Sequence, residues 1–88
     1  MIVKVNKAFL KDLAKLPVNE RQRIEKWVFE ESEKTEAIEA TGLFQKLKGY
    51  ETYYRARFGN YRVGVRFEND VLIFERVLHR KEIYRYFP

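Results

Sequence analysis

The spacing of apolar residues changes once along this chain, and that change most constrains its fold. After a short strand-like start, apolar positions recur every three or four residues up to about residue 33, whereas from Phe44 they alternate with polar ones. The first pattern is typical of helices with one buried face, and the second is typical of half-buried strands. This order predicts an α+β fold in which helices cover one face of a sheet.

The helical part predicts a strand followed by a hairpin of two helices. The strand covers residues 2–5, Asn6 can cap the first helix, and Pro17 separates it from a second helix at about residues 18–33. So short a connection makes the two helices antiparallel neighbours. In the first helix the residues that follow the helical apolar pattern are Phe9, Leu10, Leu13 and Leu16, and in the second the buried stripe would contain Ile24, Trp27 and Val28. Lys7, Lys11 and Lys15 would form a solvated face, or else a contact with RNA.

The alternating part predicts four strands and a short C-terminal helix or turn. Gly59-Asn60 and Asn69-Asp70 are two-residue turns, so the last three strands form consecutive hairpins. The last strand is apolar on both faces and is therefore expected inside the sheet. The expected strands are residues 44–48 (an edge strand), 53–58, 61–68 and 71–78, with a loop or helical turn at 32–41 and the tail at 80–86. The whole is expected to be a single domain, residues 1–88, with the helical hairpin on one face of a mainly antiparallel, twisted sheet of four to five strands.

Positive charge is confined to the second half of the chain. Residues 1–45 carry eight basic and eight acidic side chains, whereas residues 46–88 carry ten and five, so the net charge of +5 lies there. Tyr54, Ala56, Phe58, Val63, Val65 and Phe67 should face the helices, which sends Arg55, Arg57, Arg62 and Arg66 to the other face. Alternation puts Arg76 on one side with Leu72, Phe74 and Leu78. Such a face suits a nucleic acid or an acidic peptide, and it could also be simply solvated.

Several common sites are missing from the sequence. The chain has no cysteine and one histidine, and its glycines lack the spacing of a phosphate-binding loop, so we expect neither a metal nor a cofactor. No apolar run is long enough for a signal peptide or a membrane span, so we expect a cytoplasmic protein with no membrane partner. Chemistry on a phosphodiester without metal needs only cations, a proton acceptor and a proton donor.

The C-terminal segment contains candidate groups for such chemistry. His79 could exchange a proton near neutral pH, or it could simply end a strand. Tyr84 and Tyr86 could stack on an exposed base, although one of them is expected to pack on the core because they alternate with Ile83 and Phe87.

Four segments resemble the RelE branch of the RelE/ParE toxin superfamily: Lys46 to Gly49, Tyr54 to Arg57, Gly59 to Val63 and Val77 to Tyr84. The resemblance implies the toxin of a type II toxin–antitoxin pair, a ribosome-dependent mRNA endonuclease that cleaves codons in the A site. In that reaction the 2′-OH attacks the adjacent phosphate without a metal. The implied partners are a RelB-like antitoxin that neutralises the toxin, the ribosome with its mRNA, and operator DNA only through the antitoxin.

The resemblance also implies roles for single residues. Arg62 would stabilise the transition state, Arg80 the leaving group or phosphate, and Tyr84 would stack on or orient the nucleotide. Arg55 and Arg57 stand where well-known members carry two lysines, one of them the proposed general base. Arginine does not lose its proton in proteins, so the acceptor would be His79, Lys48, Lys46 or a water. The candidate catalytic residues are thus Arg62, Arg80, Tyr84 and His79, and the RNA-binding candidates are Arg55, Arg57, Lys46, Lys48, Arg85 and Tyr86.

Two other functions stay open. A ParE-like toxin would bind and poison DNA gyrase without nuclease chemistry, but such toxins usually lack the basic, tyrosine-bearing C-terminal motif that Arg80 and Tyr84 form here. A non-catalytic relic would only bind an antitoxin and act as co-repressor.

Overall fold

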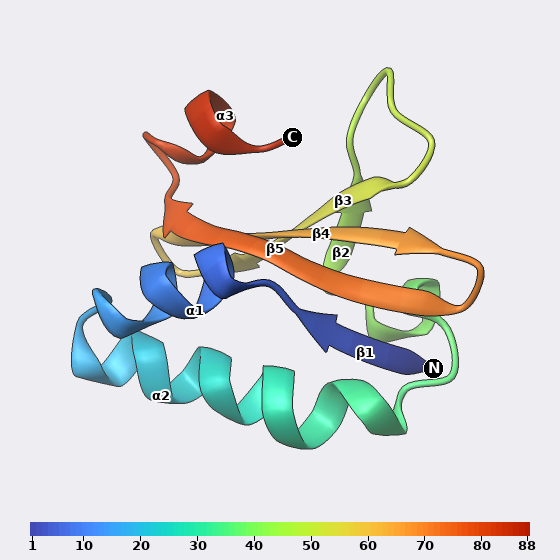
Figure 1. Ribbon diagram of the computed structural model, residues 1–88, viewed down its shortest axis with the longest axis horizontal. Coiled ribbons are helices and arrows are strands. Elements are labelled where there is room, and N and C mark those ends of the chain that lie inside the picture. The colour runs from blue at the N-terminus through green and yellow to red at the C-terminus, as the bar shows by residue number, and fades with distance from the viewer.

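A five-stranded sheet forms the centre of the protein, as a computed structural model of residues 1–88 shows (Figure 1). Its strand order is β1-β5-β4-β3-β2, in which β1 runs parallel to β5 and all other pairs are antiparallel. The strands are β1 (Ile2–Val5), β2 (Phe44–Lys46), β3 (Tyr53–Phe58), β4 (Tyr61–Glu68) and β5 (Val71–His79).

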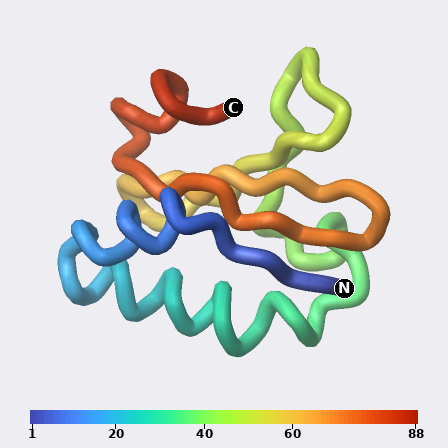
Figure 2. Tube along the Cα trace, viewed as in Figure 1, coloured from blue at the N-terminus to red at the C-terminus, as the bar shows by residue number.

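The helices cover one face of this sheet, and a shorter one closes the chain. The first two form the predicted antiparallel hairpin, which lies below the sheet in Figure 1, and the trace in Figure 2 shows the C-terminal segment returning over the opposite side. The helices are α1 (Lys7–Ala14), α2 (Val18–Lys26) and α3 (Ile83–Tyr86); α2 continues through a π turn (Trp27–Glu31) and a 3-10 turn (Ser32–Lys34), and a further 3-10 turn covers Ile38–Thr41. None of them is long and apolar enough to cross a membrane.

The core lies between the helical hairpin and the sheet. Phe9 of α1 is completely buried against Phe74 of β5, with the ring centroids 5.4 Å apart. Trp27 packs edge-on against Phe44 and Phe74, at 5.3 and 6.0 Å, which confirms its assignment to the core. The sheet contributes alternate residues to this layer, namely Ala56, Phe58, Val63, Val65, Leu72, Phe74 and Val77.

The structure confirms the predicted fold class and most element boundaries. β3 and β4 cover the residues expected of them, β5 is an interior strand, and Lys7, Lys11 and Lys15 are exposed. The edge strand is shorter than expected, because it ends at Lys46 and the chain then turns away.

One prediction about side-chain orientation was wrong. Simple alternation put Leu78 on the same face as Phe74, but β5 contains a bulge where Val65 pairs with Phe74 and Gly64 pairs with Arg76. Glu75 is the extra residue, so the alternation is reset after it. Leu78 therefore pairs with Arg62 on the face away from the helices, and Arg76 pairs with Gly64 on that same face, so the expectation that Arg76 shares a side with Leu72 and Phe74 was wrong as well.

In its C-terminal part β5 has no strand partner on the β1 side, and a residue of α1 binds its backbone there instead. β1 pairs only with the first part of β5, up to Phe74. Beyond that point the carboxylate of Asp12 accepts the Val77 N–H at 3.1 Å, and it binds Arg76 through Nε at 2.7 Å and Nη2 at 3.0 Å. These hydrogen bonds raise the pKa of Arg76, and they leave no free N–H at Val77 for another strand to pair with.

Candidate functional site

Four arginines gather on the sheet face that the helical hairpin leaves open. Arg57 and Arg62 are directly opposite each other on β3 and β4, and Arg55 lies two residues before Arg57 on the same face. Arg80 joins them from the turn after β5, where its N–H donates to the Asn60 carbonyl at 2.8 Å. We call Arg55, Arg57, Arg62 and Arg80 the arginine cluster.

Arg62 is the most buried member of the cluster. Its side chain lies under its neighbours, the residue is 8% exposed, and Nη1 donates to the carbonyls of Gly59 at 2.8 Å and Tyr61 at 3.0 Å. Burial is the main cause of its lowered pKa, followed by the charges of Arg57 and Arg55, and Arg80 adds to the effect. No carboxylate is among the groups that shift this pKa. A bound anion would therefore relieve repulsion that the free protein contains.

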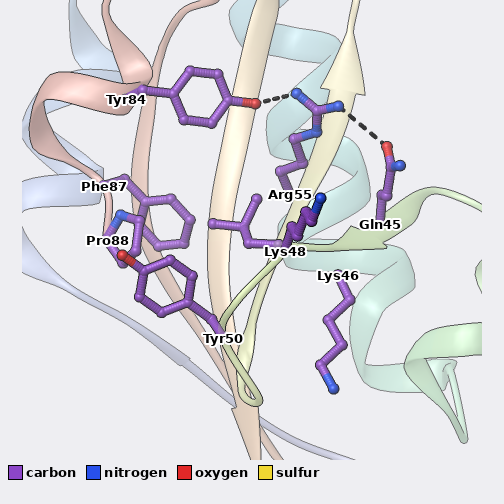
Figure 3. Close-up of a pocket in the computed structure, with 9 residues that line it drawn as sticks. Gln45, Lys46, Lys48, Tyr50, Arg55, Tyr84, Phe87 and Pro88 are labelled. Atoms are coloured by element: carbon purple, nitrogen blue, oxygen red, sulfur yellow. Dashed lines mark hydrogen bonds between the residues drawn. The ribbon is translucent and has the colours of Figure 1, made fainter.

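The C-terminal segment brings Tyr84 to the cluster. Ile83 and Phe87 are buried, and Phe87 packs on Gly64 so closely that a Cβ added there would lie 2.6 Å from the ring. This anchor places the Tyr84 hydroxyl within hydrogen-bonding contact of Arg55 Nη1, with the Arg55 guanidinium 5.8 Å from the centroid of the Tyr84 ring. The interaction is drawn in Figure 3.

The prediction that Tyr84 or Tyr86 packs on the core was wrong. Both are 55% exposed, because the segment is helical and buries residues four apart, Ile83 and Phe87, rather than alternate ones. The ring of Tyr86 lies over the side chain of Arg76, with its centroid 5.2 Å from the guanidinium carbon. Tyr86 is therefore not part of the arginine cluster. Arg85 is exposed on the same helix.

His79 lies on the other side of the sheet from the cluster. It pairs with Tyr61, a partly buried residue that packs against the core beneath the helices, and the two rings meet edge-on at 5.6 Å. Its Nδ1 accepts the N–H of Lys81 at 3.1 Å. The structure therefore does not bring the imidazole to the arginines, since consecutive strand residues point to opposite faces.

A hollow of about 450 Å³ adjoins the cluster at the edge strand. Lys46 and Lys48 line it together with Arg55 and Tyr84, although Figure 3 shows Lys46 pointing away from the Arg55–Tyr84 pair. Five lining residues were not among the predicted site residues, of which Gln45 and Tyr50 have side chains that can form hydrogen bonds. The position of Gln45 directly opposite Arg55 in the β2–β3 pairing is the signal that could have identified it.

Arg66 points to the same open face but is not part of the cluster. It lies farther along β4, opposite Tyr53, and forms an ion pair with Glu75 of the bulge, Nε to Oε2 at 3.2 Å. Its charge is therefore already compensated within the protein.

Comparisons with known proteins agree on one family. A family model described as the ParE toxin of type II toxin–antitoxin systems, parDE, matches residues 3–84. Toxin RelE3 of Methanocaldococcus jannaschii is 48% identical over 83 residues, which cover 93% of each chain.

Solved structures show the same likeness. A chain in the RelB–RelE antitoxin–toxin complex from Methanococcus jannaschii superposes with a TM-score of 0.80 at 45% identity, covering 97% of this chain and 99% of that one. In the toxin–antitoxin complex RelBE2 from Mycobacterium tuberculosis the TM-score is 0.70 at 23% identity, over 90% and 96% of the two chains. At that lower identity the likeness is one of fold.

Proposed function

This chain belongs to the RelE/ParE superfamily as a RelE-type toxin of a type II toxin–antitoxin system, and from that premise we propose that it is a ribosome-dependent mRNA endonuclease. The observation that carries the proposal is the convergence of three arginines around the buried side chain of Arg62, with an exposed tyrosine beside them. Cations held in place suit a reaction whose transition state gathers negative charge on a phosphate. An exposed aromatic ring suits an unpaired base.

The proposed reaction is attack of an mRNA 2′-OH on the adjacent phosphate. A bond forms between the 2′ oxygen and phosphorus while the bond to the 5′ oxygen breaks, which leaves a 2′,3′-cyclic phosphate. The 2′-OH proton passes to a base, and the leaving 5′ oxygen takes a proton from water to become the 5′-OH. Arg62 stabilises the charge on the phosphate, Arg80 stabilises the leaving oxygen, and Tyr84 orients the nucleotide. Arg55 and Arg57 bind the neighbouring phosphates, and preorganised positive charge supplies most of the rate enhancement.

The proton of the 2′-OH needs an acceptor outside the cluster, because arginine stays protonated. His79 faces the helical side of the sheet, so we propose a water held between the arginines, or Lys48 in its neutral amine form, instead. Lys48 lines the hollow next to Arg55, whereas Lys46 points away from the Arg55–Tyr84 pair (Figure 3).

The proposed partners follow from the same premise. Solved relatives are complexes of RelE with RelB, so we propose a RelB-like antitoxin that covers the arginine cluster and binds operator DNA together with this chain. The substrate would be mRNA in the A site of a ribosome in the cytoplasm.

Primer extension on mRNA from a purified translation system tests the proposal. Wild-type protein should produce cuts at A-site codons, and adding antitoxin should abolish them. Free mRNA without ribosomes should be cut far less. Intact mRNA on translating ribosomes, at toxin concentrations that stop growth, would refute the nuclease.

A second candidate function is favoured by the family model, whose description is that of a ParE toxin. Such a chain would bind gyrase and block supercoiling without cutting RNA. Supercoiling of relaxed plasmid by purified gyrase is the complementary assay, and inhibition there with intact mRNA would favour this function.

A further inference from the structure

We propose that the hollow beside the arginine cluster is a stacking site for one nucleobase of single-stranded RNA, with Tyr50 as its aromatic wall. The inference rests on the proposed function for the class of ligand, and it adds to that function a subsite and a residue. The hollow measures about 450 Å³, within the range of roughly 300–1,000 Å³ in which protein sites bind small ligands.

Tyr50 has the exposure and the support that base stacking requires. The residue is 47% exposed. Its ring meets Tyr53 edge-on at 5.7 Å, and Tyr53 in turn meets Phe87 edge-on at 5.5 Å. Figure 3 shows Tyr50 and Tyr84 at opposite ends of the hollow, with Phe87 and Pro88 along one side. A ring that is fixed at its edge and open to solvent is a platform for an unstacked base.

The loop that carries Tyr50 is held in one conformation by its backbone. The N–H of Leu47 donates to the Tyr53 carbonyl at 2.9 Å, and the N–H of Tyr50 donates to the Leu47 carbonyl at 3.2 Å. Gly49 has a φ of +87°, a conformation that other residues rarely adopt. The platform is therefore preorganised, which lowers the entropic cost of binding.

The charge of the hollow points to an anionic ligand. Lys46, Lys48 and Arg55 line it, and none of the nine lining side chains is acidic. Cations could also bind an acidic peptide, so the affinity of Tyr50→Ala for the antitoxin and for RNA distinguishes the two ligands. A flat ring next to phosphate-binding cations matches a nucleotide.

Arg55 links the hollow to the proposed site of cleavage. It belongs to the arginine cluster and also lines the hollow, so a strand with one phosphate at Arg62 would place a neighbouring nucleotide over Tyr50. Arg55 Nη2 donates to Gln45 Oε1 at 3.2 Å. That bond leaves the amide NH₂ of Gln45 free to donate to the edge of the base.

Binding of short RNA without ribosomes tests the inference separately from cleavage. The probe is a six-nucleotide RNA whose 2′ oxygens are methylated, which prevents the proposed attack, and which carries the fluorescent base 2-aminopurine at one position at a time. Wild-type protein should quench the fluorescence at the position that lies over Tyr50, because stacking on an aromatic ring quenches this base. A base on Tyr84 would be quenched at a separate position, which Tyr50→Ala should leave unchanged. Tyr50→Ala should remove the quenching and weaken binding roughly tenfold, whereas Tyr50→Phe should preserve both.

Phe29→Ala is the matched control. Phe29 is 48% exposed and lies on the helical hairpin, so its loss should leave RNA binding unchanged. Equal affinity of wild type and Tyr50→Ala, or no quenching at low salt by the wild type, would overturn the inference. So would a Tyr50→Ala protein that loses affinity for its antitoxin but not for RNA, since the hollow would then bind protein. If the protein is not a nuclease but the stacking site is real, only the ribosome cleavage assay would be negative, and RNA binding and quenching would remain.

Discussion

Arg57 and Arg62 lie directly opposite each other on β3 and β4, so two like charges occupy neighbouring positions on one sheet face. Opposite charges or apolar pairs stabilise such positions, and like charges destabilise them. Arg62 is also mostly buried, and both burial and the charge of Arg57 lower its pKa. The free protein therefore contains a repulsion that an anionic ligand would remove.

Arg57→Gln should raise the free energy of unfolding by about 0.5 kcal/mol, because it removes a like charge next to Arg62. The lowered pKa of Arg62 means that its positive charge is less favourable in the folded protein than in the unfolded chain. This destabilisation is present at every pH below the lowered pKa and is lost only as the pH rises above it. The gain should therefore be constant across neutral pH, as measured by urea denaturation. Arg66→Gln is the control, and it should give no gain because Arg66 is paired with Glu75. An equal gain in both variants would contradict the specific repulsion.

Arg62→Ala should slow ribosome-dependent cleavage by about 100-fold or more while the domain stays folded. That loss is on the scale seen when one preorganised donor to a developing oxyanion is removed. Arg66→Ala is again the matched control, since it removes an arginine from the same strand and face that lies outside the cluster. Primer extension over time, with circular dichroism on both variants, measures the effect. Cleavage by Arg62→Ala at the wild-type rate would refute the assignment.

The cluster was predictable because it depends on local rules. The two-residue turn at Gly59-Asn60 fixes the register of β3 and β4, and that register puts Arg57 opposite Arg62. The apolar alternation in both strands then decides which face meets the helices. For Arg55, Arg57 and Arg62 these steps need only the sequence of one hairpin, whereas Arg80 reaches the cluster from the turn after β5.

What the sequence did not reveal depends on contacts between distant segments. The bulge at Glu75 reverses the orientation of Leu78, and it lies next to the place where Asp12 of α1 binds Arg76. The tail was correctly expected to be a helix or turn, but the packing of Phe87 on Gly64 and the burial of Ile83 were not foreseen, so the alternation argument gave the wrong orientation for Tyr84 or Tyr86. The hollow around Tyr50 likewise needs β2, its loop and the tail together.

Gly64→Ala should destabilise the protein by about 2 kcal/mol, because the added Cβ would lie 2.6 Å from the ring of Phe87. Displacement of that ring would also move Tyr84 away from Arg55, so cleavage should fall as well. Combining the change with Phe87→Leu, which makes room for the Cβ, should recover part of the stability. A double-mutant cycle by chemical denaturation measures this coupling. Purely additive effects would show that Phe87 does not pack on Gly64 in solution.

Asp12→Ala should cost about 2 kcal/mol, because it removes both the partner of Arg76 and the acceptor of the Val77 N–H. The raised pKa of Arg76 means that its contribution is fully present around neutral pH and is lost only as the pH rises through the arginine pKa, so the cost should not vary near neutrality. Glu25→Ala breaks an exposed pair with Arg21, 3.8 Å apart, and should change stability by less than about 0.5 kcal/mol. Equal costs for the two variants would contradict a role for Asp12 in closing the edge of β5.

His79→Asn should retain most of the cleavage activity, whereas His79→Ala should lose about tenfold. The Nδ1 atom of His79 accepts the Lys81 N–H at 3.1 Å, and the oxygen of asparagine can accept the same hydrogen bond. That bond stabilises the turn that carries Arg80 to the cluster. The same turn is stabilised by a second hydrogen bond, in which the N–H of Glu82 donates to the carbonyl of His79 at 2.8 Å. A tenfold loss agrees with a small misplacement of one charged group. Complete loss of activity in His79→Asn, with wild-type stability, would instead identify the imidazole as the proton acceptor, because asparagine cannot accept a proton from the 2′-OH at neutral pH.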